Sequence, residues 1–132
     1  MNYYLDTSIL LDYYEKRGKN GELAFQLIQK INQEKGVIFI SDIHIRELKA
    51  LDYLSEEIQK IFIITKPSSF LVHITKIEAQ EARMLSLKRK VPFLDVLHAI
   101  LARNNEALLI STDKHFESLK DICSFKKPEE LI

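Results

Sequence analysis

The sequence predicts an α/β fold with one central, mostly parallel sheet of about four to five short strands flanked by helices. Short apolar runs bounded by turn residues, such as Val37-Ile38-Phe39-Ile40, are typical of strands buried on both faces. Segments with apolar residues at helical spacing alternate with these runs, which favours parallel strands joined by helices. Three Gly and three Pro are too few for a loop-rich all-β fold.

Strand and helix signals alternate through the first half of the chain. Asp6-Thr7-Ser8 forms the turn and cap after the first strand, and Thr7 and Ser8 are expected to do the capping. Gly36 is expected to cap the end of the second helix. Leu54-Ser55-Glu56-Glu57 is expected to interrupt the next one. The expected elements are a strand at 3–5, helices at 9–16 and 22–34, a strand at 37–40, and a helix from 43 into the fifties followed by a second helical piece.

In the second half, the capping box Thr75-Lys76-Ile77-Glu78 begins a helix. Val91-Pro92 ends that helix, and Pro92 suits the first position of the next one, where a backbone N–H would have no partner. The expected elements are a strand at 68–74, helices at 76–90 and 93–104, a strand at 108–110, a short helix at 115–119, a strand near 122–125 and a terminal turn at 128–131.

Length and composition restrict the class of protein. A chain of 132 residues fits one domain spanning 1–132. Lys plus Arg equals Asp plus Glu at 19 each, so a nucleic-acid partner must bind a local basic patch. The single Cys123 excludes an internal disulfide and a multi-cysteine zinc site, and we expect it to be buried. Without a secretory signal or a membrane-spanning apolar run, we expect a cytoplasmic protein with no membrane partner.

Two acids follow predicted strands. Asp6 comes after the first strand and Asp113 after the strand at 108–110. In open parallel sheets, ligands bind beyond the carboxyl ends of the strands, so both acids are candidates for a binding site. Each acid taken alone is explained at least as well by helix capping.

Glu47 lies in the middle of a predicted apolar stripe. Glutamate is rarely fully buried without a partner, and the neighbouring Arg46 and Lys49 point off the stripe. We therefore expect Glu47 to have a partner from another segment. The alternative is that this helix lies at the rim of the protein and Glu47 reaches water. The stripe consists of Ile43, Ala50, Leu51, Leu54 and Ile58.

Asp95 lies on the small-residue face of the predicted helix at 93–104, together with Ala99 and Ala102. A face of small residues allows a close approach to another group. The alternative is that Asp95 only complements the helix dipole in the first turn. The four acids come from four separate segments, and carboxylate oxygens suit Mg²⁺ or Mn²⁺. The inferred chemistry is phosphodiester hydrolysis assisted by one or two such ions.

Four segments resemble the PIN domain family, and in particular its small single-domain members, which include the VapC toxins of prokaryotic toxin–antitoxin pairs. The resemblance implies a Rossmann-like sheet and a Mg²⁺- or Mn²⁺-dependent endoribonuclease. It also implies that Asp6, Glu47, Asp95 and Asp113 form the acidic cluster, supported by Thr7, Ser8 or Thr112. The segments are Tyr4-Leu5-Asp6-Thr7-Ser8, Ile45-Arg46-Glu47-Leu48, Phe93-Leu94-Asp95-Val96-Leu97-His98-Ala99 and Ser111-Thr112-Asp113-Lys114-His115-Phe116, and the tail Lys127-Pro128-Glu129-Glu130-Leu131 is also similar.

His115 departs from the family pattern, because many relatives carry another acid before the closing aromatic. We expect His115 to be half-exposed, and His98 to pack or to support the site rather than to bind metal. The resemblance further implies a small antitoxin partner and a homodimer, for which the helices from Leu23 to Ile61 offer an interface. An RNA substrate needs cations beside the acids, and Arg46, Lys49, Arg103 and Lys114 are the candidates.

Two other enzyme or regulatory classes fit these residues less well. A phosphatase with Asp6 as nucleophile would be expected to have a second acid two residues later, where Ser8 stands. A receiver-like regulatory domain would be expected to have paired acids on the first strand. The alternative from a different class is a non-catalytic RNA-binding or assembly module that retains the fold.

Overall fold

Five short parallel strands form one sheet in the computed structural model, which describes residues 1–132. The strand order is β3-β2-β1-β4-β5, and every neighbouring pair is parallel. The predicted α/β fold is therefore confirmed. The strands are β1 (Asn2–Leu5), β2 (Val37–Ser41), β3 (Ser69–Val72), β4 (Leu108–Ile110) and β5 (Phe125–Lys126).

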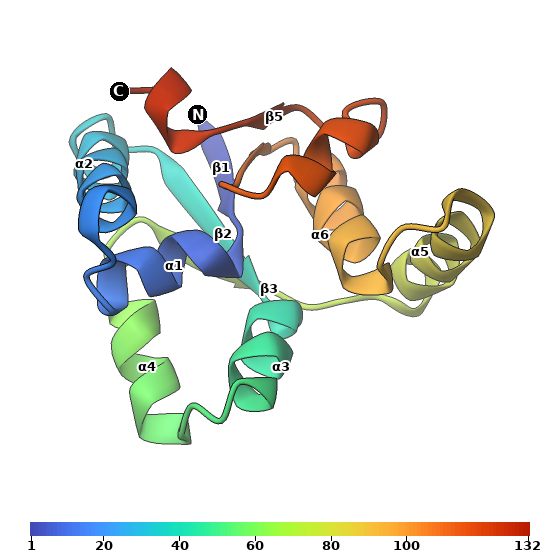
Figure 1. The fold of residues 1–132 in the computed structure, drawn as a ribbon, viewed down its shortest axis with the longest axis horizontal. Helices are drawn as coiled ribbons and strands as arrows, with labels where there is room; N and C mark the ends of the chain where they lie inside the picture. Colours follow the sequence, from blue (N-terminus) through green and yellow to red (C-terminus); the bar gives the residue numbers. More distant parts are fainter.

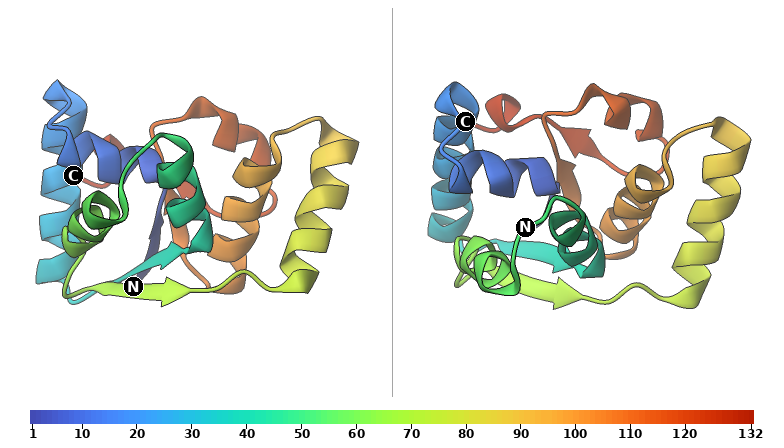
Figure 2. Two further views of the ribbon diagram at one scale, coloured as in Figure 1. Left: turned by 90° about the horizontal axis from the view of Figure 1, so that it is seen from below. Right: turned by 60° about the horizontal axis from the view of Figure 1, so that its bottom comes forward.

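Helices cover both faces of this sheet. Figure 1 shows α1, α2 and α4 on one side and α5 and α6 on the other. The third helix, α3, lies at the carboxyl edge between these two layers (Figure 2). The helices are α1 (Thr7–Tyr14), α2 (Gly18–Gln33), α3 (Asp42–Ala50), α4 (Ser55–Ile63), α5 (Lys76–Arg89) and α6 (Phe93–Asn104), with 3-10 turns η1 (Lys114–Leu119) and η2 (Pro128–Glu130).

The side chains of β1 alternate between two hydrophobic cores. Tyr3 and Leu5 belong to the core under α1, α2 and α4, whereas Tyr4 belongs to the core under α6 and η1. Successive side chains of a strand point to opposite faces, so a strand in the middle of a sheet must be apolar on both. Cys123 is buried in the second core, as predicted.

Several predicted boundaries shift. The first helix begins at Thr7, directly after its cap, and α2 begins at Gly18. The helix that follows β2 stops already at Ala50, whereas the predicted second helical piece is confirmed as α4, which begins at Ser55. Gly36 is not the left-handed cap of α2, because Lys35 takes that conformation with a φ of 58°.

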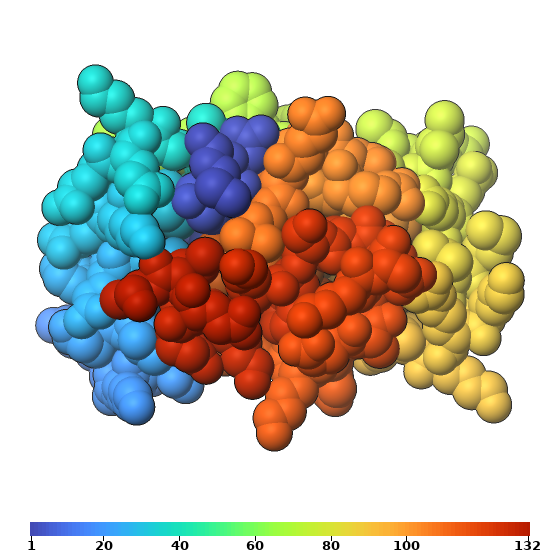
Figure 3. Space-filling view, turned by 90° about the horizontal axis from the view of Figure 1, so that it is seen from above, coloured from blue at the N-terminus to red at the C-terminus, as the bar shows by residue number.

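The two ends of the chain meet at the amino edge of the sheet. Figure 3 looks onto this edge, where the first residues lie between the end of α2 and the last turn. Lys30 donates a hydrogen bond to the carbonyl of Leu131, which holds η2 against α2. None of the helices combines the length and the apolar character needed to cross a membrane.

Candidate metal centre

The four predicted acids come from segments around the point where the strand order reverses. β1 has β2 on one side and β4 on the other, so the chain moves outward in two directions from β1. Ligands of open parallel sheets bind at such a point, beyond the carboxyl ends. Asp6 follows β1 and Asp113 lies just beyond β4, while Glu47 comes from α3 and Asp95 from the first turn of α6.

Asp6 is held by three donors. Its Oδ1 accepts the backbone N–H of Thr7 at 2.8 Å, and its Oδ2 accepts the hydroxyls of Ser8 at 3.0 Å and Ser111 at 2.7 Å. Asp6 is itself the N-cap of α1. The prediction that Thr7 and Ser8 cap the helix is therefore wrong, because their hydroxyls are bonded to the acids instead.

Glu47 is bonded through a single oxygen. Its Oε1 accepts the hydroxyl of Thr7 at 2.8 Å and lies 2.6 Å from Nε2 of His98. Burial acts to raise the pKa of Glu47, but the hydrogen bond and positive charge of His98 outweigh it and lower the pKa. The glutamate thus has the partners from other segments that its position predicted.

The apolar stripe that singled out Glu47 does not exist as predicted. Leu51 and Leu54 are 58% and 68% exposed, because α3 ends at Ala50 and the chain turns through Asp52, whose φ is 68°. The buried face of α3 is instead formed by Ile43, His44 and Leu48. Glu47 lies at the edge of that face and is partly exposed.

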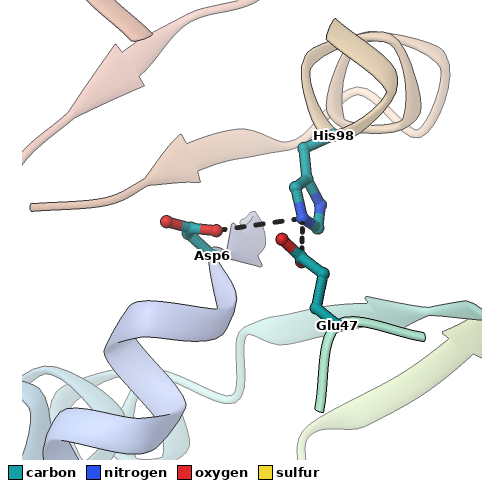
Figure 4. Close-up of side chains that lie close together, drawn as sticks. All are labelled: Asp6, Glu47 and His98. Atoms are coloured by element: carbon teal, nitrogen blue, oxygen red, sulfur yellow. Dashed lines mark hydrogen bonds and ion pairs between the residues drawn. The ribbon is translucent and has the colours of Figure 1, made fainter. Parts of the chain in front are cut away.

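A buried polar network lies behind Glu47. His98 is fully buried, and its Nδ1 lies 2.6 Å from the hydroxyl of Tyr4, which lies 2.8 Å from Oγ of Ser41. Burial acts to lower the pKa of His98, but the hydrogen bond to Glu47 and the charge of Asp6 raise it above the ordinary value. Figure 4 shows His98 pointing between the carboxylates of Asp6 and Glu47.

His44 completes this network from the start of α3. Its Nδ1 accepts the backbone N–H of Ser41 at 2.9 Å, and its Nε2 donates to the carbonyl of Leu5 at 2.6 Å. Burial and the charge of His98 lower the pKa of His44 to about 3, so it is neutral. His44 therefore ties α3 to the residue before Asp6.

Asp95 differs from the other acids because its carboxylate has no hydrogen bond or ion pair within the protein. It is nevertheless half-buried. Burial, followed by the charges of Asp6 and Asp113, raises the pKa of Asp95 to about 6. The protein itself therefore supplies no positive group that fully offsets the charge of this carboxylate.

Asp113 caps η1 through the backbone N–H of His115 at 2.9 Å. The imidazole Nδ1 of His115 lies 3.2 Å from Asp113, but 72% of the side chain is exposed. His115 is thus more exposed than predicted.

Ser111 takes the supporting position that was predicted for Thr112. Its buried hydroxyl donates to Asp6 and accepts the backbone N–H of Asp113 at 2.9 Å, so it joins the acids that follow β1 and β4. The hydroxyl of Thr112 makes no hydrogen bond. Sequence reasoning did not assign a role at the site to four polar residues, although Ser41 ends β2 and Ser111 directly follows β4. The four residues are Tyr4, Ser41, His44 and Ser111.

Only some of the predicted RNA-binding residues lie beside the four acids. Arg46, Lys49 and Lys114 are exposed and form no ion pair. Arg46 directly precedes Glu47, and Lys114 directly follows Asp113. Arg103 is not near the acids. It lies about two turns beyond Asp95 on α6 and is bonded to both oxygens of Glu81.

The donor set fits a hard divalent cation. Side-chain oxygen and nitrogen atoms of Asp6, Glu47 and His98 lie within 4.8 Å of one another, and so do those of Asp95, Asp113 and His115. Carboxylate oxygens predominate in both, which is the preference of Mg²⁺ and Mn²⁺. The two sets interact electrostatically, because the charge of Asp6 in the first set raises the pKa of Asp95 in the second.

Comparisons with known proteins agree with this architecture. Among solved structures, similarity covers 96% of this chain and 98% of a chain from VapBC2 of Rickettsia felis bound to a promoter DNA fragment, at a TM-score of 0.73 and 18% identity. VapBC-1 from nontypeable Haemophilus influenzae gives a TM-score of 0.69 at 18% identity, covering 98% of this chain and 99% of that chain. At these identities the similarity shows a shared fold. No curated protein sequence matches this chain.

Comparison of the sequence with protein-family models shows the family to which the chain belongs. The model described as PIN domain matches residues 3–122 and so spans all four acids. This confirms the resemblance found in the sequence, and the chain belongs to the PIN domain family.

Proposed function

We propose that this protein is a Mg²⁺- or Mn²⁺-dependent endoribonuclease. The observation that carries the proposal is the half-buried carboxylate of Asp95. It has no hydrogen-bond or ion-pair partner in the protein, and the negative charges of Asp6 and Asp113 act on it. Leaving a carboxylate unpaired among like charges costs free energy, and a bound cation removes that cost. The chain belongs to the PIN domain family, whose members are generally nucleases, and this supports hydrolysis of a nucleic acid as the reaction.

Asp6, Glu47, Asp95 and Asp113 are proposed to hold the cation. Both oxygens of Asp6 already accept hydrogen bonds, so this carboxylate is fixed before a cation arrives. Asp95 lacks such bonds and provides free oxygens. When bound, Mg²⁺ or Mn²⁺ supplies a Lewis acid for activating water and for neutralising charge on a phosphodiester.

RNA is the proposed substrate, and Arg46, Lys49 and Lys114 are proposed to contact its phosphates. These side chains are exposed and free of ion pairs, so no carboxylate has to be displaced before phosphate binds. Contacts of this kind position a nucleic acid without selecting a sequence. We do not assign this role to Arg103, because Glu81 already binds its guanidinium.

We further propose that the protein acts in the cytoplasm as the toxin of a toxin–antitoxin pair, as a homodimer of one PIN domain spanning 1–132. The support is the fold shared with VapBC2 and VapBC-1 and with the toxin-antitoxin complex from Klebsiella pneumoniae. Induced expression in a bacterial host is expected to arrest growth, with Asp95→Asn harmless. Unimpaired growth at high protein levels would contradict the toxin role.

The nuclease proposal is tested by incubating the purified protein with single-stranded and structured RNA, and with DNA of the same sequence. We expect RNA cleavage with Mg²⁺ or Mn²⁺, none with EDTA, and a loss of at least about 100-fold in Asp95→Asn. Asp52→Asn is the matched control, since Asp52 is exposed and asparagine tolerates its positive φ.

The outcomes separate the candidate functions. Cleavage that persists in EDTA or in Asp95→Asn would reject the metal mechanism. Preferential cleavage of DNA would replace the proposed substrate. RNA binding without cleavage under any metal would favour the non-catalytic module.

A further inference from the structure

The two oxygens of Glu47 have different surroundings. Oε1 accepts the hydroxyl of Thr7 and the Nε2–H of His98, whereas Oε2 contacts no donor in the protein. Figure 4 shows the second oxygen on the side that faces Asp6. A carboxylate held through one oxygen in this way keeps the other free in a fixed direction.

His98 is held at both ring nitrogens. Its Nε2 lies 2.6 Å from Glu47, and its Nδ1 lies 2.6 Å from the hydroxyl of Tyr4. Tyr4 is itself fully buried, and its hydroxyl also bonds to Ser41. Rotating the imidazole would leave buried polar groups unpaired, so the ring has one favourable orientation.

His98 lies within ligand distance of Asp6 and Glu47 but is not arranged as a ligand. An ionised carboxylate only accepts hydrogen bonds, so the ring nitrogen beside Glu47 carries the hydrogen. That nitrogen has no lone pair to offer a cation. The other nitrogen faces Tyr4 in the core and points away from the acids.

We propose, resting on the nuclease function proposed above, that His98 is a positioning residue for Glu47. His98, fixed from behind by Tyr4, occupies Oε1 together with Thr7 and leaves Oε2 directed at the cation site. The chain Ser41–Tyr4–His98–Glu47 thereby links the ends of two strands to the orientation of one acid. Partners of this kind commonly change metal affinity or activity by about 10- to 100-fold when they are removed.

The test measures Mn²⁺ affinity of the full-length protein by isothermal titration calorimetry, without RNA. His98→Leu removes the N–H that bonds to Glu47, and we expect its Mn²⁺ affinity to fall by about tenfold or more. His98→Gln is the matched variant, because its amide nitrogen can donate to the same oxygen. We expect His98→Gln to stay within about threefold of the parent.

Tyr4→Phe provides a second variant in case a buried leucine at position 98 prevents folding. It removes one hydroxyl and keeps the ring that fills the core. We expect circular dichroism like that of the parent and a loss of Mn²⁺ affinity of about threefold to tenfold. A matched control is Tyr53→Phe, whose hydroxyl bonds to exposed Glu15 and should leave affinity unchanged.

Two results would overturn the positioning role. One is unchanged Mn²⁺ affinity in a folded Tyr4→Phe or His98→Leu protein. The other is a His98→Gln protein as weak as His98→Leu, which would show that the N–H donor is not what matters. A parent protein that does not bind Mn²⁺, or that binds it as well after Asp6→Asn with Glu47→Gln, would instead remove the proposed metal site itself.

Discussion

Ser111 donates its hydroxyl hydrogen to Oδ2 of Asp6 at 2.7 Å and so bridges the ends of the neighbouring strands β1 and β4. The hydroxyl oxygen of Ser111 also accepts the backbone N–H of Asp113. One buried hydroxyl therefore sets the relative positions of the two acids that follow these strands. The site depends on this residue although it has no charge.

We predict that Ser111→Ala lowers the free energy of unfolding by about 1–2 kcal/mol, because it leaves a buried carboxylate oxygen and an N–H with fewer partners. We also expect weaker Mn²⁺ binding. Chemical denaturation and calorimetry measure the two effects. Ser124→Ala, an exposed serine near β5, is the control. If Thr112→Val had the larger effect, the assignment of the supporting hydroxyl to Ser111 would be wrong.

Asp95 gives a prediction about pH. Its pKa is raised to about 6, first by burial, whereas an unfolded aspartate titrates near 3.9. The folded protein therefore disfavours the charged form, and stability is lost as the pH rises from about 4 through about 6. Asp95→Asn removes this cost. After discounting for partial exposure, we expect the metal-free variant to be more stable by about 1 kcal/mol near pH 7.5.

This gain should disappear near pH 4, where Asp95 is protonated in the folded parent. Urea unfolding in EDTA at both pH values measures it, with Asp52→Asn as the control. An equal gain at both pH values would mean that it does not come from the charge. At neutral pH, saturating Mn²⁺ should make the parent more stable than Asp95→Asn, because ligand binding stabilises the parent more than the variant.

Gly21 allows α1 and α2 to pack closely. A Cβ at this position would lie 2.7 Å from the backbone oxygen of Asp12, too close without moving one helix. We predict that Gly21→Ala destabilises the protein by about 1–3 kcal/mol, although alanine favours helices. Thermal unfolding measures this, and Asn20→Ala, exposed on the same helix, should be neutral or slightly stabilising. A more stable Gly21→Ala protein would contradict the packing argument.

The parts of the fold that follow local rules could be predicted from the sequence. The capping box at Thr75 begins α5, and α6 spans 93–104, both as expected, although Pro92 is the N-cap of α6 and not its first residue. The prediction of an apolar stripe around Glu47 was wrong. It placed residues 43–58 on one continuous helix, whereas the chain turns at Asp52. A left-handed aspartate carries no clear signal in sequence.

The polar network could not be predicted for a different reason. Tyr4 and His98 are separated by 94 positions, and Tyr4 and Ser41 by 37. Their hydrogen bonds depend on the strand order and on the rotation of α6, which local patterns do not determine. In the sequence Tyr4 is a strand residue, Ser41 follows a predicted strand, and His98 is expected to pack or to support the site. Only the assembled sheet brings these side chains behind Glu47.

The free cations beside the acids give the last prediction. Arg46 and Lys114 form no ion pair, so their replacement should weaken RNA binding without reducing stability. We expect Arg46→Ala with Lys114→Ala, compared in an inactive Asp95→Asn background, to lower the slope of log affinity against log salt by about 0.7 for each phosphate that is no longer neutralised. Fluorescence anisotropy across a salt series measures this slope. The charge-matched control Lys60→Ala with Lys88→Ala removes exposed lysines from α4 and α5. If this control lowers the slope equally, the effect comes from net charge, and RNA does not approach the acids along α3 and η1.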